Sequence, residues 1–178
     1  GLHGMSRGAW KRYSDDGFKH YQIVFPGFKY NMMDMQAALG IHQLKRVEAY
    51  LKRREQLWSC YDEAFADLPL QLPPPAEKDT RHARHLYTIL LKIEDLKVNR
   101  DKVLQALHEE NIGTGIHFIA LHQHPYYRET YGYKKEDFPH ALYVSERTIS
   151  LPLSAKLTDD DAKDVIDAVT RVLHRFSR

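Results

Sequence analysis

A long stretch of helical periodicity, followed at once by prolines, most constrains how this chain can fold. Large apolar residues recur between Asp34 and Leu68 at steps of three and four, the period of one helix face: Leu44, Val47, Leu51, Trp58, Tyr61, Phe65 and Leu68. Pro69 and the run Pro73–Pro75 must end this helix, because proline lacks the N–H group and disfavours helix in the preceding residue. The pattern predicts one long linking helix over residues 34–68, about 50 Å long at 1.5 Å per residue.

Shorter elements are expected after the prolines. Residues 69–84 are interpreted as a stiff connector. Apolar and β-branched runs predict strands at His85–Ile93, Ile112–Phe118 and Thr148–Leu151. Capping residues and apolar stripes predict a helix at Arg100–Glu110 after Asn99 and another behind Thr158, with a helical turn at Ala141–Arg147. Residues 117–133 are expected to form a loop or short helix.

These elements predict an α+β domain over residues 69–178, with a small three-stranded sheet and flanking helices. Residues 1–33 are rich in glycine, aromatic and charged residues and lack periodicity. They are expected to form an irregular segment, with a short helix near Ala9–Tyr13. Because the chain opens on Gly1 without a start methionine, we interpret it as a piece of a longer protein.

Composition and charge disfavour several classes of protein. The 26 basic and 24 acidic residues give a net charge of +2, without the basic excess typical of nucleic-acid binding. No apolar run approaches the ~20 residues of a membrane helix, so no membrane partner is expected. The single cysteine, Cys60, cannot form an internal disulfide, which favours the reducing cytoplasm, and a packed, inert thiol is the favoured interpretation.

The segment before the predicted linking helix carries a candidate anion site. Lys29, Tyr30 and Asn31 follow Gly27 and precede Asp34, where the first helical N–H groups and the helix dipole favour an anion. Asn31 is also a natural N-cap, and Lys29 could simply point to solvent. From the residues alone, anion binding and simple capping are equally favoured.

A second candidate site is the cluster of histidine and aromatic residues between His117 and Arg128. A metal site is disfavoured, because no carboxylate lies among the histidines before Glu129 and Pro125 fixes the turn. A rim for a phosphorylated or sugar ligand remains open, since His, Tyr and Arg donate to oxygens and aromatic faces cover sugar rings. A surface turn with half-buried tyrosines also remains open. Neither a nucleophile elbow nor a Gly-rich phosphate loop is present in the sequence.

A series of short motifs in order resembles a known family. They are Leu2-His3-Gly4-Met5-Ser6, Pro26–Asn31, Asp34–Gly40, Gln43-Leu44, Arg53-Arg54, His85-Leu86-Tyr87, Asn111–Phe118, His122, Tyr126-Tyr127-Arg128, Ser145-Glu146-Arg147 and Ser150–Leu153. Over essentially its whole length, the chain resembles the C-terminal part of the DegT/StrS family. These are pyridoxal-phosphate-dependent sugar-nucleotide aminotransferases of the aspartate-aminotransferase (fold type I) architecture. The similarity is greatest to the branch that includes UDP-4-amino-4-deoxyarabinose aminotransferases.

The resemblance implies an activity for a longer parent protein. Such enzymes hold pyridoxal phosphate on a lysine, take an amino group, usually from glutamate, and pass it to a keto nucleotide sugar. Their products serve cell-surface polysaccharide, lipopolysaccharide or antibiotic-sugar biosynthesis, and the family forms cytoplasmic homodimers with shared active sites. The matching cofactor lysine and its partner aspartate would precede Gly1, so these 178 residues alone are expected to be inactive. The alternative is a non-catalytic, aminotransferase-like binding or regulatory module.

The resemblance also implies roles for particular residues. Lys29 occupies the place of an asparagine that reaches the cofactor phosphate of the neighbouring subunit, with Tyr30 and Asn31 beside it. A set of residues matches the segment that shapes the substrate pocket: His117, Phe118, Tyr126, Tyr127 and Arg128. Of these, His117 and Tyr127 are assigned to the nucleotide sugar. His3 and Ser6 fall near the cofactor edge, and no catalytic or metal-binding residue is expected within the chain.

Overall fold

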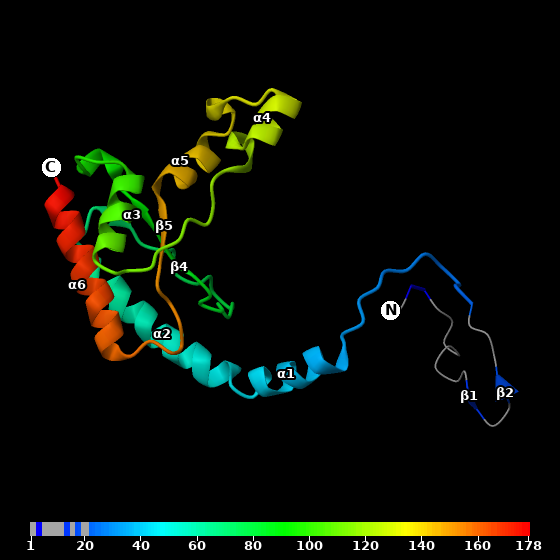
Figure 1. Ribbon diagram of the computed structural model, residues 1–178. Helices are drawn as coiled ribbons and strands as arrows, with labels where there is room; N and C mark the ends of the chain where they lie inside the picture. Colours follow the sequence, from blue (N-terminus) through cyan, green and yellow to red (C-terminus); the bar gives the residue numbers. More distant parts are fainter. Residues whose placement is uncertain (1–2, 5–12, 15–16, 19–21) are drawn as a thin grey trace. The chain divides into compact units, whose positions relative to one another are not determined.

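The computed structural model describes residues 3–4, 13–14, 17–18 and 22–178. The chain divides into two compact units, Gly1–Val47 and Glu48–Arg178 (Figure 1). In the first unit, strands β1 (Tyr13–Ser14) and β2 (Gly17–Phe18) pair antiparallel, and helix α1 spans Asp34–Leu44. The short helix expected near Ala9–Tyr13 falls largely outside the described residues, and Tyr13 itself belongs to β1.

Two glycines hold the segment before α1 against the start of the chain. Gly4 has φ of +77°, and a Cβ there would lie 1.8 Å from the carbonyl oxygen of Phe25. The Val24 N–H donates to the Gly4 carbonyl at 2.9 Å, and a Cβ on Gly27 would lie 2.4 Å from the Gly4 nitrogen. Only glycine at both positions permits this close backbone approach.

The predicted linking helix is interrupted, which corrects the prediction of one continuous helix over residues 34–68. Helix α1 ends at Leu44, and α2 spans Val47–Ala64. Between them the Arg46 N–H bonds to the Gln43 carbonyl, three residues back at 3.0 Å, so the last turn tightens to the 3₁₀ type. Neither Lys45 nor Arg46 is a helix breaker by type, and the apolar spacing from Leu44 to Val47 continues across the turn. Periodicity alone therefore could not locate the break.

The second unit contains an antiparallel sheet with the order β3-β4-β5. Strand β3 is Leu70–Gln71, β4 is Tyr87–Leu91 and β5 is Thr148–Leu151. The prediction of three strands is confirmed in number, and β5 has the predicted bounds. The predicted strand at Ile112–Phe118 is wrong: the segment joins the sheet only through one bridge from Gly115 to Ser150. Glycines at 113 and 115 lower its strand propensity, and β3, inside the predicted connector, takes the third place.

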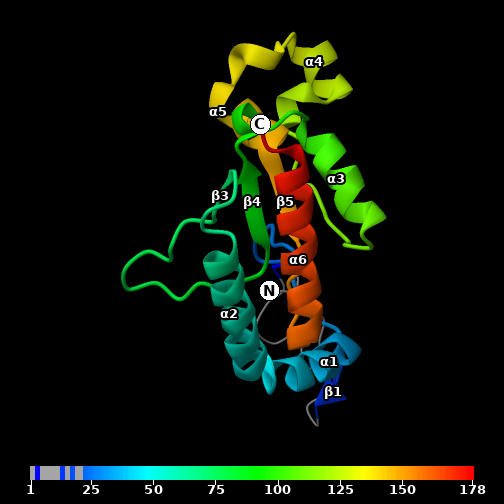
Figure 2. The same cartoon turned by 90° about the vertical axis from the view of Figure 1, so that its left-hand side faces the viewer.

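Helices α2, α3 (Arg100–Glu109) and α6 (Asp159–Phe176) lie on one face of the sheet (Figures 1 and 2). Burial alternates along β4: Tyr87, Ile89 and Leu91 are buried, whereas Thr88 and Leu90 are only partly covered. Tyr87, Ile89 and Leu91 belong to the core formed with the helices. Thr88 and Leu90 therefore lie on the opposite face of the sheet.

The predicted N-caps of α3 and α6 are confirmed. The Asn99 carboxamide oxygen accepts the Lys102 N–H at 3.0 Å. The Thr158 hydroxyl accepts the Asp161 N–H at 3.1 Å, and the Asp161 carboxylate accepts the Thr158 N–H at 2.8 Å. These hydrogen bonds to its ionised form lower the pKa of Asp161.

Two tyrosine hydroxyls connect α2 to β4 and to the segment that follows β5. Tyr61, Phe65 and Tyr87 are fully covered, and the Tyr61 and Tyr87 rings meet edge to face at 5.0 Å. The Tyr61 hydroxyl donates to the Pro152 carbonyl at 3.0 Å, and the Tyr87 hydroxyl donates to Asp62 Oδ1 at 2.7 Å. Burial raises the pKa of Tyr61 to about 12; burial and then the Asp62 hydrogen bond raise that of Tyr87.

Residues 117–147 form a helical excursion beyond the end of the sheet (Figure 1). It contains the 3₁₀ turns η3 (Leu121–Gln123) and η4 (Lys135–Asp137) and the helices α4 (Pro125–Tyr131) and α5 (Pro139–Arg147). Prolines open both helices at a first-turn position, where the missing N–H costs least. The short helix and the helical turn predicted here are confirmed, with α5 starting two residues earlier. The turn η2 (Ile93–Asp95) follows β4.

Candidate functional site

The structure fixes the ring of His117 against the face of the sheet opposite the helices. Its Nδ1 atom lies 2.8 Å from the Ser150 hydroxyl oxygen, which lies 3.1 Å from the Thr88 hydroxyl oxygen. The bridge between Gly115 and Ser150 brings the His117 segment to this place through backbone hydrogen bonds of 3.0 and 2.8 Å. Of the five residues predicted to shape the substrate pocket, His117 is thus the one held at the sheet.

Gly115 makes room for the His117 ring. A Cβ on Gly115 would lie 2.8 Å from Cε1 and 3.3 Å from Nδ1 of the imidazole. The ring therefore rests on the bare backbone of Gly115 while Ser150 holds its edge. The His117–Phe118 peptide bond is cis, and the Phe118 ring meets the His117 ring edge on at 4.8 Å. Phe118 is 72% exposed, so it borders the site rather than filling it.

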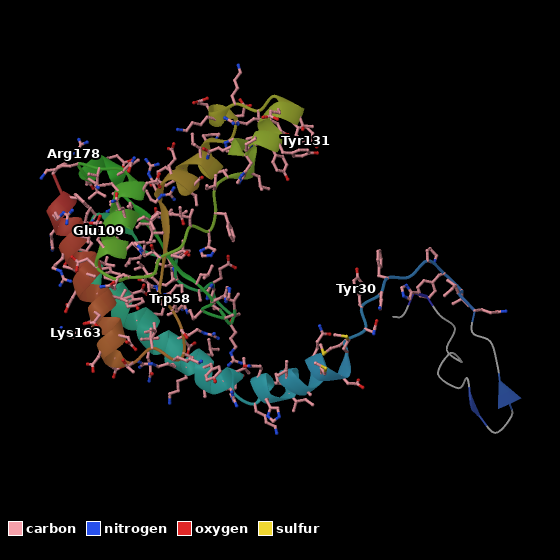
Figure 3. All side chains as sticks on the ribbon, viewed as in Figure 1. Tyr30, Trp58, Glu109, Tyr131, Lys163 and Arg178 are labelled. Atoms are coloured by element: carbon pink, nitrogen blue, oxygen red, sulfur yellow. The ribbon has the colours of Figure 1, made fainter. Side chains whose placement is uncertain are left out.

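Tyr127 lies in an aromatic hollow formed by the excursion at 117–147. The hollow has a volume of about 660 Å³, and its walls are Leu121, His122, Tyr127, Tyr131, Tyr133, Phe138 and Ala141. The Tyr127 and Tyr131 rings stack at 6.2 Å, and the Tyr131 and Tyr133 rings at 5.5 Å. Figure 3 shows Tyr131 on α4 within the excursion. This volume and lining suit a planar or ring-shaped organic group.

Arg128 lines a smaller, basic hollow of about 310 Å³ beside the aromatic one, with Tyr133 contributing to both. Lys134 and Lys135 line it too. Lys135 is paired with Glu146 at 2.5 Å, and this contact raises the pKa of Lys135. Arg128 and Lys134 have no carboxylate partner among the described residues, so they are the cations left for an external anion.

Tyr126 and His122 also belong to the cluster of histidine and aromatic residues. Tyr126 is 63% exposed and faces neither hollow, although its ring meets Tyr127 edge on at 5.3 Å. His122 is buried, and its Nε2–H donates to the Lys135 carbonyl at 3.0 Å. Because that nitrogen carries a proton, it is not a free metal ligand. Across residues 3–4, 13–14, 17–18 and 22–178, no group of three or more His, Cys, Asp or Glu side chains could hold a metal ion.

Lys29, Tyr30 and Asn31 precede α1 in the first unit. All three are exposed, Tyr30 by 77%, and its ring stacks on Phe28 at 5.4 Å (Figure 3). None of their side chains forms a hydrogen bond or ion pair within the described part of the chain. The interpretation of Asn31 as the N-cap is wrong: Met33 occupies that position, and the Gln36 amide oxygen accepts the Met33 N–H at 3.0 Å. Cation, phenol and carboxamide are left free for an outside group.

Sequence reasoning missed the residues that hold the site together. Ser145 is buried in α5, and its hydroxyl accepts the Ala120 N–H at 2.9 Å and lies 3.2 Å from the Gln123 amide. Ser150 and Thr88 anchor His117 in the same way from β5 and β4. Strand pairing reveals these roles, because Thr88 and Ser150 are register partners across β4 and β5. The His3 side chain forms no hydrogen bond, ion pair or ring contact among the described residues, and Ser6 lies outside them.

The DegT/DnrJ/EryC1/StrS aminotransferase family matches residues 1–170, so the chain belongs to this family. An uncharacterized protein of Methanocaldococcus jannaschii is 52% identical over 172 residues. The spore coat polysaccharide biosynthesis protein SpsC of Bacillus subtilis is 47% identical over 173 residues. Each alignment covers 97% of this chain but only 45% and 44% of the relatives, so the chain spans less than half of their length.

Solved structures of other proteins share the fold of this chain. Spr1654 of Streptococcus pneumoniae, a protein assigned as a sugar aminotransferase, is known in apo, PMP and PLP forms. Its PLP form aligns with a TM-score of 0.79 at 29% identity, over 98% of this chain and 41% of that one. Streptomyces venezuelae DesV, solved with a ketimine intermediate, aligns with a TM-score of 0.77 at 26% identity, over 95% of this chain and 44% of that one.

None of the helices within the described ranges is long and apolar enough to cross a membrane.

Proposed function

We propose that this chain is the C-terminal part of a pyridoxal-phosphate-dependent aminotransferase that passes an amino group, from glutamate, to a keto nucleotide sugar. Residues 69–178 would be its small domain, residues 34–68 the link and residues 1–33 part of the large-domain and dimer-interface region. The product would enter polysaccharide, lipopolysaccharide or antibiotic-sugar biosynthesis in the cytoplasm. The family match over residues 1–170 carries this proposal.

The residues before α1 fit the phosphate of the cofactor. Lys29 brings a cation, and Tyr30 and Asn31 bring a hydroxyl and an amide, all exposed and without partners in the described residues. When bound, pyridoxal phosphate supplies the electron sink for amino transfer. Lys29 would contact its phosphate in the other subunit of a homodimer, as a point charge without the fixed geometry of an arginine. The cofactor lysine itself would lie outside these 178 residues.

The residues of the second unit fit a sugar nucleotide. His117 and Tyr127 would donate to oxygens of the ligand, and Arg128 would bind negative charge from the basic hollow. Phe118 and Tyr126 would cover the ligand with their exposed rings. The aromatic hollow and the basic hollow adjoin through Tyr133, which supports a ligand that combines a ring with an anion.

The cofactor role is tested with the protein expressed from its complete gene. Lys29→Ala should weaken retention of pyridoxal phosphate by about tenfold to a hundredfold, the worth of one charge-assisted hydrogen bond. Lys45→Ala is the matched control, because Lys45 is also exposed and lies just after α1. An unchanged cofactor affinity in Lys29→Ala would refute the phosphate contact.

The proposal that these 178 residues are part of a longer enzyme is tested by mixing them alone with pyridoxal phosphate. We expect neither a visible absorbance band from covalently held cofactor nor amino transfer, whereas the protein from the complete gene should show both. Activity of the 178 residues alone would overturn this part of the proposal. A complete gene without a cofactor lysine would favour the non-catalytic module instead.

A further inference from the structure

Arg100 is the only lysine or arginine that is buried among the described residues, with 9% of its surface exposed. It is the first residue of α3, directly after the N-cap Asn99. The free N–H groups and the dipole of a helix disfavour a cation in the first turn, and burial of a charge adds a further cost. Local rules therefore disfavour an arginine at this position, and contacts outside α3 must offset that cost.

These contacts lead to the turn that joins α5 to β5. Nη1 of Arg100 donates to the Ser145 carbonyl at 3.3 Å and to the Thr148 carbonyl at 3.2 Å. Ser145 lies in the last turn of α5, where the carbonyl groups lack partners within the helix and attract a cation. Nε of Arg100 donates to Asp101 Oδ1 at 2.6 Å, which helps to fix the plane of the guanidinium group.

The turn at residues 145–148 lies between the two parts of the candidate site. After the turn, Ser150 of β5 contacts the His117 ring. Before the turn, α5 carries Ala141, which is a wall of the aromatic hollow that contains Tyr127. The direction in which α5 leaves the sheet therefore sets where the hollow lies relative to the His117 ring.

We propose that Arg100 is a positioning residue for the ligand, which holds the helical excursion at 117–147 in the orientation that lets His117 and Tyr127 contact the same molecule. Arg100 lines neither hollow, so it acts through the backbone carbonyls of the turn. An arginine suits this role, because a planar guanidinium donates in several fixed directions whereas a lysine ammonium acts as a point charge. The ligand is taken from the proposed function, whereas the orientation of the excursion depends on this chain alone.

The distance between two spin labels measures this orientation in the protein from its complete gene. The labels are attached at Thr130→Cys on α4 and Asp164→Cys on α6, both at exposed positions, after the natural cysteines are changed to serine. Dilution with unlabelled protein makes pairs of labels within one chain dominate the signal. We expect one narrow distance when Arg100 is present. Arg100→Met keeps the apolar stem and loses the donors, so it should raise the population at other distances about tenfold, the factor that a hydrogen bond from a charged group supports.

Two further variants separate positioning from the effect of charge. Lys102→Met is the matched control, because Lys102 is also a cation in the first turn of α3 but is exposed, and its side chain bonds only to Gln105 in the described part of the chain. It should leave the distance unchanged. Arg100→Lys keeps the charge without the fixed donor directions and should give a second distance; should Arg100→Met fail to fold, this variant still decides. An unchanged distance distribution in either Arg100 variant would overturn the inference.

UDP added to the same proteins tests the connection to the ligand. If only chains with the oriented excursion bind UDP, the affinity of Arg100→Met, measured by calorimetry, should fall by the same factor as the population at the original distance. Saturating UDP should restore that distance. A displaced excursion with unchanged UDP affinity would overturn the role of Arg100 toward the ligand. If UDP does not bind when Arg100 is present, the proposed nucleotide is wrong, while the label distances still decide whether Arg100 holds the excursion.

Discussion

The two core tyrosines predict that this fold loses stability in alkaline solution. Burial raises the pKa of Tyr61 to about 12, from an ordinary value of 10.0, and burial with the Asp62 hydrogen bond raises that of Tyr87. A raised pKa of a neutral acid means that the folded chain keeps a proton that the unfolded chain gives up. The free energy of unfolding is therefore full below about pH 10 and falls as the pH rises toward 12.

The size of the loss in unfolding free energy follows from the number of protons that the folded chain keeps and the unfolded chain releases. Each tyrosine that stays protonated only in the folded state lowers the free energy of unfolding by at most about 1.4 kcal/mol per pH unit. The acceptors Asp62 and Pro152 are partly exposed, so solvent screening reduces both pKa shifts, and we expect the loss averaged over pH 10 to 12 to be roughly half of this value for each tyrosine. Two tyrosines then give a slope of about 1.4 kcal/mol per pH unit between pH 10 and 12.

Urea unfolding followed by far-ultraviolet circular dichroism measures this slope. Tyr61→Phe should halve it, and at neutral pH should cost about 1 kcal/mol for the lost hydrogen bond to the Pro152 carbonyl. Tyr126→Phe is the matched control, because its side chain is 63% exposed and makes no hydrogen bond within the described residues. If Tyr61→Phe and Tyr87→Phe together leave the alkaline slope unchanged, the two hydroxyls do not control it.

Three further substitutions test the packing that positions the site. Thr158→Ala should lower the free energy of unfolding by about 1 kcal/mol through loss of the N-cap, whereas Thr170→Ala in the same helix should change it little; urea titration distinguishes them. Arg53→Met should lower the free energy of unfolding by about 2 kcal/mol, because Arg53 donates two hydrogen bonds to the Leu157 carbonyl. Most of this loss should remain when the urea titration is repeated at high salt. Ile149→Ala should cost about 3 kcal/mol and lower the melting temperature, since Ile149 is fully buried in β5; a loss below 1 kcal/mol would contradict its place in the core.

The sequence correctly predicted the elements whose start or end is determined by residues within or next to the element. Asn99 and Thr158 cap helices because a short polar side chain can reach the free N–H groups of the first turn. Thr148–Leu151 was predictable because four residues of strand-forming or small type end at Pro152. In each case the decisive interaction lies within a few residues, so the sequence alone contains it.

The wrong predictions have non-local causes. Ile112–Phe118 has strand-forming residues, but only Gly115 finds a partner, and that partner is Ser150 in a strand far along the chain. Leu70–Gln71 pairs with Leu90–Leu91 although two residues show no alternation that could reveal a strand. Pairing in a sheet depends on which edges meet, which single-chain periodicity does not encode.

The residue types of the candidate site could be read from the sequence, whereas the residues that hold it in place could not. Histidine, tyrosine and arginine between 117 and 128 carry recognisable donors, so their part in a polar rim could be proposed from residue type alone. Ser145, Ser150 and Thr88 are common residues whose roles arise only when β4, β5 and α5 come together. Residue type thus identifies candidate ligand-binding groups, and the sheet register decides how His117 is held.

Helix α1 shows that an apolar period does not by itself predict burial. Leu44 belongs to the predicted apolar face, yet Leu44, like Leu39 and Ile41, is more than half exposed, and the helix buries no residue. In α2 the same period does lead into the core, through Leu57, Trp58 and Tyr61. An apolar stripe reports that a helix has a face suited to burial, and it carries no information about which surface supplies the cover.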